Sequence, residues 1–416
     1  MFRRRSYDVC VGRTFALSYS EIPYGVSPMQ SPHAVLPSTT ADELARQEFV
    51  KSLKFHLAAR IGPANRLAFD TRARPAWEKD RGGAPTDYRE VAAAMSADHF
   101  YRYWSSMQRN SQEMMWQSVQ RPVERQWDAL RSAAHEQGTA LGSLRLDPTV
   151  ELPRYHSAVD IHCMPGGYHS EVGEDDVAQG AVYDRAVYLY AMGRMGGLND
   201  DMGHTCVQYL KRAHPELAPR RILDMGCTVG HSTLPYVDAY PEAEVYAIDV
   251  AAPVLRYAHA RAESLGRRVH FSQQNAEKTD FPDGFFDLIV SHIMVHETSD
   301  KAIRTIMREA HRLLSPGGLV IHAETPPYQA LDPFDAFMLD WDTRNNNEPY
   351  WGASHEIDPV ALAVETGFDG SKAFEVMEPS AFAEAEARRT RIFQGGDFAG
   401  GGAWYLYGVR KAAAGA

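Results

Sequence analysis

The stretch RRILDMGCTVGHSTLPYVDAYPEAEVYAIDV, from Arg220 to Val250, decides the fold. A first run of apolar residues ends in Asp224, breaks at two glycines and passes into a helical pattern. A second apolar run then ends in another acid, Asp249. A strand, a glycine-containing turn, a helix and a second strand in this order predict a parallel βαβ unit.

The same alternation of strands and helices surrounds this stretch. Helical periods precede it and follow it, and short apolar runs lie between them. We therefore predict an α/β protein with a Rossmann-like, doubly wound sheet. The expected helices cover about 175–194, 199–213, 251–265 and 300–314, and the expected strands cover 269–274, 287–293 and 319–324.

The turn after Asp224 lies where open α/β sheets bind their ligands, at the carboxyl end of a strand. It lacks the G-x-G-x-x-G spacing of a dinucleotide site, and the chain has no G-x-x-x-x-G-K-[ST] phosphate loop, so a nucleotide-dependent oxidoreductase is disfavoured. Asp249 is placed to accept both hydroxyl hydrogens of a ribose. Asp224 would repel a phosphate but suits an ammonium and a sulfonium, a combination that describes S-adenosylmethionine.

Four motifs carry a resemblance to a known family: ILDMGCTVG, VYAIDV, NAEKTDFPDGFFDLIVSHIMVHE and MREAHRLLSPGGLVIHAE. In this order and at these separations they resemble class I S-adenosylmethionine-dependent methyltransferases, most closely the small-molecule branch with the ubiquinone/menaquinone methyltransferases. The resemblance covers about 175–330, and the tail to Lys411 is compatible with the last two strands. It implies an enzyme that methylates a small, partly apolar molecule of secondary or lipid/quinone-type metabolism.

The resemblance also implies a cofactor site made of residues from these motifs. Thr228 stands where the family's turn has its central glycine, and Asn275 stands where the family usually has an acid. These two departures support an alternative, a regulatory or scaffold protein that binds the cofactor without catalysis. The implied roles are the methionine turn (Asp224, Gly226, Cys227, Thr228, Gly230), the ribose (Asp249), the adenine (Val250, Asn275, Ala276) and the sulfonium (Ser291).

Methyl transfer mainly needs alignment, and an O–H or C–H acceptor also needs a base. The segment SHIMVHE follows a predicted strand and offers His292, His296 and Glu297. We place His296 first, because an imidazole with a pKa near 6.5 can accept a proton at neutral pH. His292 and Glu297 are the reserves.

Two segments are expected to contact the acceptor. The histidine-rich stretch YHSAVDIHCMPGGYH, within a lid and connecting region over 151–218, offers His162, Tyr168 and His169. Metal binding by its histidines is conceivable, but their spacing matches no zinc template, so we predict no metal. A cap insertion at about 326–357, with a helix near 332–342, offers a second set, namely Trp341, Asn346, Tyr350 and Trp351.

A helical domain is predicted over 39–150, before the methyltransferase domain at 219–416. Thr40 and Glu43 have capping-box spacing, a loop is expected over 71–87, and Pro122 should interrupt a long helix. A stripe of Met and Trp residues either lines an apolar pocket or forms a helix core. Residues 1–38 read as a disordered or mis-annotated extension with Met29 as a possible start. We expect the helical domain to enclose the acceptor or to build a homodimer.

The composition limits the partners. A formal charge of −11 argues against a nucleic-acid-binding face. No apolar run approaches the roughly 18 residues of a membrane helix, so we expect no stable membrane insertion. Four cysteines without CxxC spacing suit a reducing compartment, and we expect a cytoplasmic protein.

Overall fold

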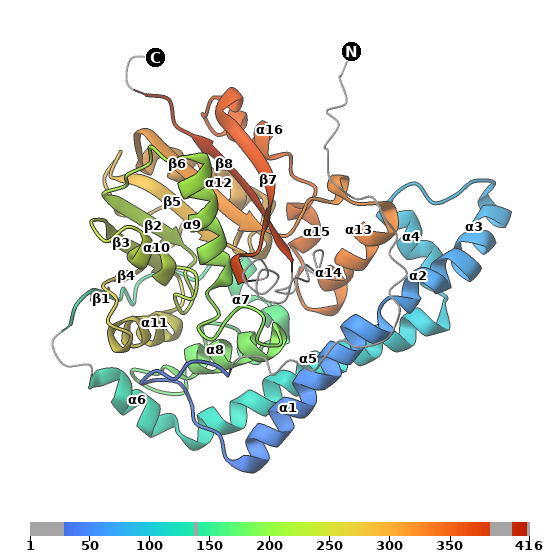
Figure 1. Cartoon of the computed structure of the whole chain (residues 1–416), viewed down its shortest axis with the longest axis horizontal. Coiled ribbons are helices and arrows are strands. Elements are labelled where there is room, and N and C mark those ends of the chain that lie inside the picture. The colour runs from blue at the N-terminus through green and yellow to red at the C-terminus, as the bar shows by residue number, and fades with distance from the viewer. Residues whose placement is uncertain (1–28, 137–139, 383–401, 414–416) are drawn as a thin grey trace.

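The computed structural model describes residues 29–136, 140–382 and 402–413. Its centre is an eight-stranded sheet in the order β1-β4-β3-β2-β5-β6-β8-β7 (Figure 1). All pairs from β1 to β6 are parallel, and β8 runs antiparallel to both β6 and β7. The strands are β1 Ser143–Arg145, β2 Arg221–Met225, β3 Glu244–Asp249, β4 His270–Gln273, β5 Phe286–His292, β6 Leu314–Glu324, β7 Ala373–Pro379 and β8 Ala403–Arg410.

The strand order confirms the doubly wound α/β sheet. β2 pairs with β3 on one side and with β5 on the other, so the direction of winding reverses beside β2. Open α/β sheets bind ligands at this switch point, outside the carboxyl ends of the strands. Strand β1 was not predicted, because it has only three residues and extends the sheet beside β4.

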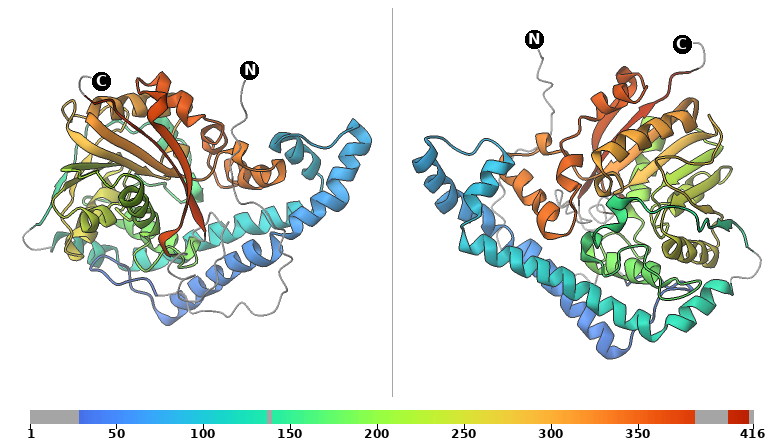
Figure 2. Two further views of the ribbon diagram at one scale, coloured as in Figure 1. Left: turned by 45° about the horizontal axis from the view of Figure 1, so that its top comes forward. Right: turned by 180° about the vertical axis from the view of Figure 1, so that it is seen from behind.

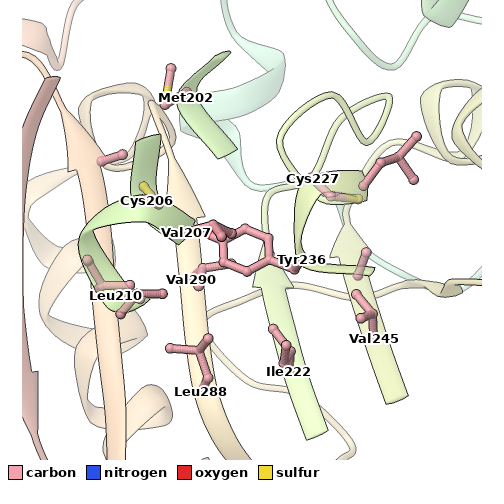
Figure 3. Close-up of a cluster of buried hydrophobic side chains, with 14 of the residues drawn as sticks. Met202, Cys206, Val207, Leu210, Ile222, Cys227, Tyr236, Val245, Leu288 and Val290 are labelled. Atoms are coloured by element: carbon pink, nitrogen blue, oxygen red, sulfur yellow. The ribbon is translucent and has the colours of Figure 1, made fainter. Parts of the chain in front are cut away.

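Helices cover both faces of the sheet. Figure 3 shows one face, where Cys206 and Leu210 of α9 pack with Ile222 and Leu288 of the strands. On the other face, α12 contributes its apolar stripe to a second core with β2 and β5. These helices are α8 Ala178–Tyr190, α9 Asp201–Ala213, α10 Leu234–Ala239, α11 Ala252–Ser264, α12 Asp300–Leu313 and α16 Pro359–Glu365.

The amino-terminal part is helical, as predicted, and reaches beyond the sheet. Both views of Figure 2 show the long helices α1 and α5 running alongside each other. The capping box at Thr40 and Glu43 is present at the start of α1. The elements are α1 Ala41–His56, η1 Leu57–Ile61, α2 Ala64–Ala68, η2 Phe69–Ala73, α3 Arg74–Arg81, α4 Tyr88–Met95, α5 His99–Arg125 and α6 Trp127–His135.

Two local predictions in this region are wrong. Helix α5 continues through Pro122. A proline leaves the carbonyl four residues earlier without its helical partner, and here Gln47 Nε2 donates to Ser118 O at 3.1 Å. The expected loop over 71–87 is helical as far as Arg81, where Gly82 adopts a left-handed φ of 77° and ends the helix.

Residues 29–38 of the amino-terminal segment pack against the rest of the protein. The expectation of disorder over 1–38 is therefore wrong for residues 29–38, and residues 1–28 lie outside the described residues. Asp184 of α8 accepts a hydrogen bond from Gln30 at 2.9 Å and lies 2.9 Å from His33 Nε2. Val35 is fully buried. These contacts fasten the segment to the sheet domain.

Short elements complete the site. The expected helix near 332–342 is broken at Asp340, whose Oδ1 accepts from Tyr328 and Thr343. Helix α13 packs against α4 through Phe334 and Phe337. Among the described residues, no helix is both long and apolar enough to cross a membrane. The remaining elements are α7 Arg154–Ser157, η3 Ile161–Cys163, η4 Val295–Glu297, η5 Tyr328–Ala330, α13 Pro333–Leu339, α14 Trp341–Asn345, α15 Trp351–Ser354 and η6 Gly370–Lys372.

Candidate active site

Two pockets meet at the carboxyl ends of β2 and β5. The larger one extends towards α5 and α8, and the smaller one extends towards β3 and β4. The two pockets share part of their walls, so they lie side by side at the switch point. The shared lining residues are Tyr183, Gly226, Thr228, His292 and Ile293.

The turn after β2 has the backbone conformation of a ligand-binding turn. Gly226 has a φ of 72°, and a Cβ atom on it would lie 2.4 Å from Met294 Cγ, so this position requires glycine. Gly230 has a φ of 75° but lines neither pocket. Thr228 has a φ of 48°, which is unusual for a β-branched residue. The threonine therefore keeps the backbone that a glycine adopts easily.

Asp224 lies at the floor of the larger pocket and is buried. Its Oδ2 accepts from Thr233 at 2.6 Å. Its Oδ1 has no hydrogen-bond partner in the described part of the chain, although His292 Nδ1 lies 3.4 Å away. Burial lowers the pKa of His292, but Asp224 outweighs burial and raises that pKa to about 10. His292 is therefore an imidazolium at neutral pH, which removes it as a base in this state.

Asp249 ends β3 and lines the smaller pocket, as predicted for the ribose contact. Its Oδ2 accepts from Thr228 N at 3.0 Å and its Oδ1 from Ala251 N at 2.9 Å. Burial raises the pKa of this carboxyl to about 6, against the lowering effect of the two N–H donors. The carboxylate thus holds the glycine turn in place and keeps lone pairs for a further donor.

Val250, Asn275 and Ala276 line the same pocket beside Asp249. The side-chain oxygen of Asn275 accepts from Glu277 N at 2.8 Å. This contact stabilises the turn that contains Asn275, and the oxygen keeps a lone pair for a further donor. The neutral amide at this position therefore has a local structural role.

The larger pocket is mainly apolar and is closed by the amino-terminal helices. Met115 and Trp116 of α5 line it, so these two members of the Met and Trp stripe contribute to a pocket. Trp116 is also part of a buried core with Val119 and Val182, so both interpretations of the stripe apply. Other apolar or aromatic lining residues are Tyr190, Met195, Met202, Trp351 and Trp404.

A buried cluster of acids and histidines lies at the border of the two pockets. His296 Nδ1 lies 2.5 Å from Glu324 Oε2, and His296 Nε2 lies 3.7 Å from Glu348 Oε2. His162 lies between two carboxylates, with Nε2 3.0 Å from Glu297 Oε1 and Nδ1 2.8 Å from Glu348 Oε1. Segment 151–218, the strand ends and segment 326–357 thus meet in this cluster.

The cluster changes the expected chemistry of His296. Burial lowers its pKa, but Glu324 and then Glu348 outweigh burial and raise it to about 9. The expected pKa near 6.5 is therefore wrong for this environment. Burial also opposes the charge on His162, yet Glu348 and Glu297 raise its pKa well above the usual 6.5. The pKa of Glu297 is lowered, because His162 and His296 outweigh its burial.

The backbone at His162 is strained. His162 has a φ of 55° and Cys163 a φ of 61°, within the short turn Ile161–Cys163. Two side chains of α5 hold this turn, because Trp116 Nε1 donates to His162 O at 2.7 Å and Gln112 Nε2 donates to it at 3.1 Å. Strain of this kind persists only where surrounding contacts fix it, and it is common at functional sites.

Several expected site residues lie away from both pockets. Ser291 is buried and bonds His322 Nδ1 at 2.7 Å. Trp341 donates to Ser105 Oγ at 2.8 Å, and Tyr350 packs edge-on against Tyr155. Asn346 supports the cluster, because its Nδ2 donates to Glu348 Oε1 at 2.9 Å. His169 packs on His156 and also lies outside the pockets.

The remaining expected residues do reach the site. Cys227, His162, His296 and Trp351 line the larger pocket, and Tyr168 and Glu297 line the smaller one. Tyr168 donates to Glu297 Oε1 at 2.8 Å. Sequence reasoning missed Tyr183, Glu324 and Glu348. Tyr183 lies in a continuous helical pattern, Glu324 is only the last residue of one of the four motifs, and Glu348 belongs to no motif, so no local signal marks them as site residues.

Comparison with known proteins assigns the domain. Residues 222–318 match a family described as "Methyltransferase domain". A demethylmenaquinone methyltransferase of Thermus thermophilus is 36% identical over 112 residues, which are 27% of this chain and 50% of that protein. A malonyl-[acyl-carrier protein] O-methyltransferase of Halorhodospira halophila is 33% identical over 119 residues, 28% and 39% of the two chains. Ajmaline N-methyltransferase of Rauvolfia serpentina is 30% identical over 133 residues, 30% and 45% of the two chains.

A solved structure is also similar, that of Haemonchus contortus phosphoethanolamine N-methyltransferase 2 in complex with S-adenosyl-L-methionine. It has 16% sequence identity and a TM-score of 0.38, over 55% of this chain and 57% of that chain. This chain spans half or less of the length of the curated relatives described above. The family match and the strand order confirm the predicted class I methyltransferase domain.

Proposed function

We propose that this protein transfers a methyl group from S-adenosylmethionine to a small, partly apolar molecule of secondary or lipid/quinone-type metabolism. The observation that carries this proposal is that the two pockets lie side by side, with Gly226, Thr228 and His292 in the walls of both. A ligand in the smaller pocket can reach into the larger one at this point. The two reactants of a methyl transfer need such an arrangement.

The residues present fit the cofactor. Asp249 directs a buried carboxylate at the smaller pocket, where ribose hydroxyls would donate to it. Asp224 Oδ1 is a buried acceptor without a hydrogen-bond partner among the described residues, and it suits the ammonium of the methionine part. Gly226 lets the turn pack closely on Met294, which a Cβ atom would prevent. These features favour a positively charged nucleoside ligand without phosphates.

When bound, the cofactor supplies an electrophilic methyl group on its sulfonium. The chain's own contribution is then alignment and exclusion of water, and Tyr183, Trp116 and Trp351 provide apolar walls for it. His296 stays our candidate to take a proton from the acceptor. His296 already carries a proton while Glu324 and Glu348 flank it. Its carboxylate environment must therefore change, so that it loses this proton, before His296 can act as a base.

The acceptor class rests on the larger pocket. Its lining combines Met and aromatic side chains with a polar end at His296 and Glu348. This suits a molecule with an apolar body and a polar group at the end that meets the methyl donor. The names of the similar proteins cover a quinone precursor, an acyl-carrier substrate and an alkaloid, and the acceptor of this chain lies in that broad range.

The proposal is tested by incubating the full-length protein with methyl-labelled S-adenosylmethionine and a metabolite extract of the host, followed by identification of labelled products. We expect one labelled small molecule whose formation needs the folded protein. Cofactor binding by calorimetry with no labelled product from any extract would favour a regulatory or scaffold role instead.

We also place the protein in the cytoplasm, a proposal that the free thiols of Cys163, Cys206 and Cys227 support. A homodimer through α1 and α5 is a further proposal. Phe49, on α1, is 59% exposed, which is consistent with a contact there. Sedimentation analysis of the full-length protein at micromolar concentration would reveal the dimer.

A further inference from the structure

His162, His296 and Glu297 form a compact set of potential metal ligands. Each offers one ligand atom, and these atoms lie within 4.8 Å of one another. The three side chains are largely shielded from solvent, with exposures of 19%, 2% and 17%. Two imidazoles and one carboxylate are a ligand set that binds divalent first-row transition metals.

Both imidazoles are oriented as they would be in a metal site. His162 Nδ1 lies 2.8 Å from Glu348 Oε1, and His296 Nδ1 lies 2.5 Å from Glu324 Oε2. Metal-binding histidines commonly donate one ring N–H to a carboxylate, which fixes the ring and leaves the other nitrogen for the ion. His162 and His296 both show this arrangement, and the Nε2 atom of each ring is left to bind the ion.

One acceptor in the cluster has no partner. Glu348 Oε2 is buried and has no hydrogen-bond partner within the described residues. It lies 3.7 Å from His296 Nε2, which is too long for a hydrogen bond. An unpaired buried carboxylate oxygen is costly, and a cation between these two atoms would satisfy it. Glu297, Glu324 and Glu348 also give the cluster an excess of negative charge.

We propose that a divalent transition-metal ion binds to His162 Nε2, His296 Nε2 and the Glu297 carboxylate, with Glu348 Oε2 as a fourth ligand. The ion would replace the protons that the two Nε2 atoms otherwise carry, so His296 would serve as the base only in the metal-free protein. Ligand bonds of about 2.0–2.2 Å place neighbouring ligand atoms about 3–3.5 Å apart. The side chains would therefore draw together by about 1 Å around the ion.

The location of this site gives it a role in acceptor binding. His162, His296 and Glu348 line the larger pocket, and Glu297 lines the smaller one. The ion would thus lie beside the junction of the pockets, where an oxygen donor of the acceptor can take a remaining position. This consequence rests on the proposed methyl transfer, whereas the metal site itself does not.

The test uses the full-length protein, freed of metal by a chelator and titrated with Co²⁺ as a spectroscopic probe and with Zn²⁺ by calorimetry. We expect one ion per chain and a visible Co²⁺ spectrum from nitrogen and oxygen ligands. His162→Ala and Glu297→Gln should each weaken binding by more than about 100-fold. Glu348→Gln should weaken it by at least about 10- to 100-fold, because Glu348 both orients His162 and supplies the fourth ligand.

His169→Ala is the matched control, because His169 belongs to the same segment and lies outside the cluster. It should keep the wild-type affinity. A folded wild type without stoichiometric Co²⁺ or Zn²⁺ binding would overturn the proposal, and so would equal losses in His169→Ala and His162→Ala. Titration of the same samples with S-adenosylmethionine separates the two proposals. A protein that binds the metal but not S-adenosylmethionine would support the metal site and contradict the methyltransferase function.

Discussion

The substitution Asp249→Asn tests the cofactor pocket most directly. It keeps the size of the side chain and removes its charge. In the protein, Oδ2 accepts from Thr228 N at 3.0 Å and Oδ1 from Ala251 N at 2.9 Å, and only 8% of the residue is exposed. An asparagine can satisfy only one of these N–H groups through its oxygen, and its NH₂ group would face the other donor.

The expected magnitude follows from the lost charge-assisted contact with the ribose. A hydrogen bond to a charged group contributes about 1.5–3 kcal/mol. We therefore expect the dissociation constant for S-adenosylmethionine to rise by about 10- to 150-fold. The measurement is calorimetric titration at pH 7.5, with S-adenosylhomocysteine as a second ligand.

The pH dependence provides a second measurement. Burial raises the pKa of Asp249 to about 6 in the free protein, so the carboxyl is mostly protonated at pH 5 and ionised at pH 7.5. Ribose hydroxyls need the ionised form, so wild-type affinity should increase as the pH rises through 6, by about tenfold from pH 5. The Asn variant should lack this dependence.

The matched control is Asp238→Asn, which removes the same charge where Asp238 pairs with Arg267 at the surface, 3.1 Å away. It should bind the cofactor as the wild type does. If folded Asp249→Asn keeps the wild-type dissociation constant and its pH profile, then Asp249 does not contact the ribose and the smaller pocket is not the nucleoside site.

Three further substitutions test other parts of the structure. Thr228→Gly should raise the unfolding free energy in urea by about 1 kcal/mol, because glycine relieves the φ of 48°, and a loss would contradict this strain. Asp184→Asn should lower it by about 3–5 kcal/mol, because the buried carboxylate bonds His231 at 2.8 Å and Tyr257 at 2.9 Å. Burial raises the pKa of Asp184, but His231 and other donors hold it well below 3.8. The stabilisation by the ionised Asp184 carboxylate is therefore present above about pH 4 and is lost at lower pH. Only the wild type should show this loss, because Asp184→Asn removes the carboxyl that titrates. Trp116→Ala should raise KM for the acceptor at an unchanged cofactor affinity, and a loss of cofactor binding would contradict its place in the larger pocket.

Local sequence patterns were enough to predict the fold and to propose the residues of the cofactor side. The fold follows from strands and helices whose hydrophobic periods can be recognised in consecutive residues. The turn at Gly226 directly follows β2, the strand that positions it. Asp249 could be placed for the same reason, because the carboxyl ends of neighbouring parallel strands share one edge. The departure from the family's glycine at Thr228 could also be recognised from the sequence, because threonine stands at a position where the backbone is left-handed.

The acceptor side depends on contacts between distant parts of the chain, and these could not be predicted. His162 meets Glu348, which is 186 residues later, and nothing near Glu348 marks it as a partner of a histidine. The pKa of His296 was mispredicted for the same reason, because Glu324 lies on another strand. The path of α5 through Pro122 likewise depends on Gln47 of a different helix.

The helical domain is part of the site because of a chain of buried polar contacts. Lys54 Nζ of α1 donates to Gln112 Oε1 at 2.8 Å, and Gln112 Nε2 donates to His162 O at 3.1 Å. This carbonyl belongs to the strained turn whose imidazole reaches Glu297 and Glu348. The position of His162 is therefore fixed from α1 and α5, and a change in either helix should alter the acceptor side. The cofactor side should be less affected, because Asp249 ends β3 and Gly226 follows β2, and these two strands pair within the sheet.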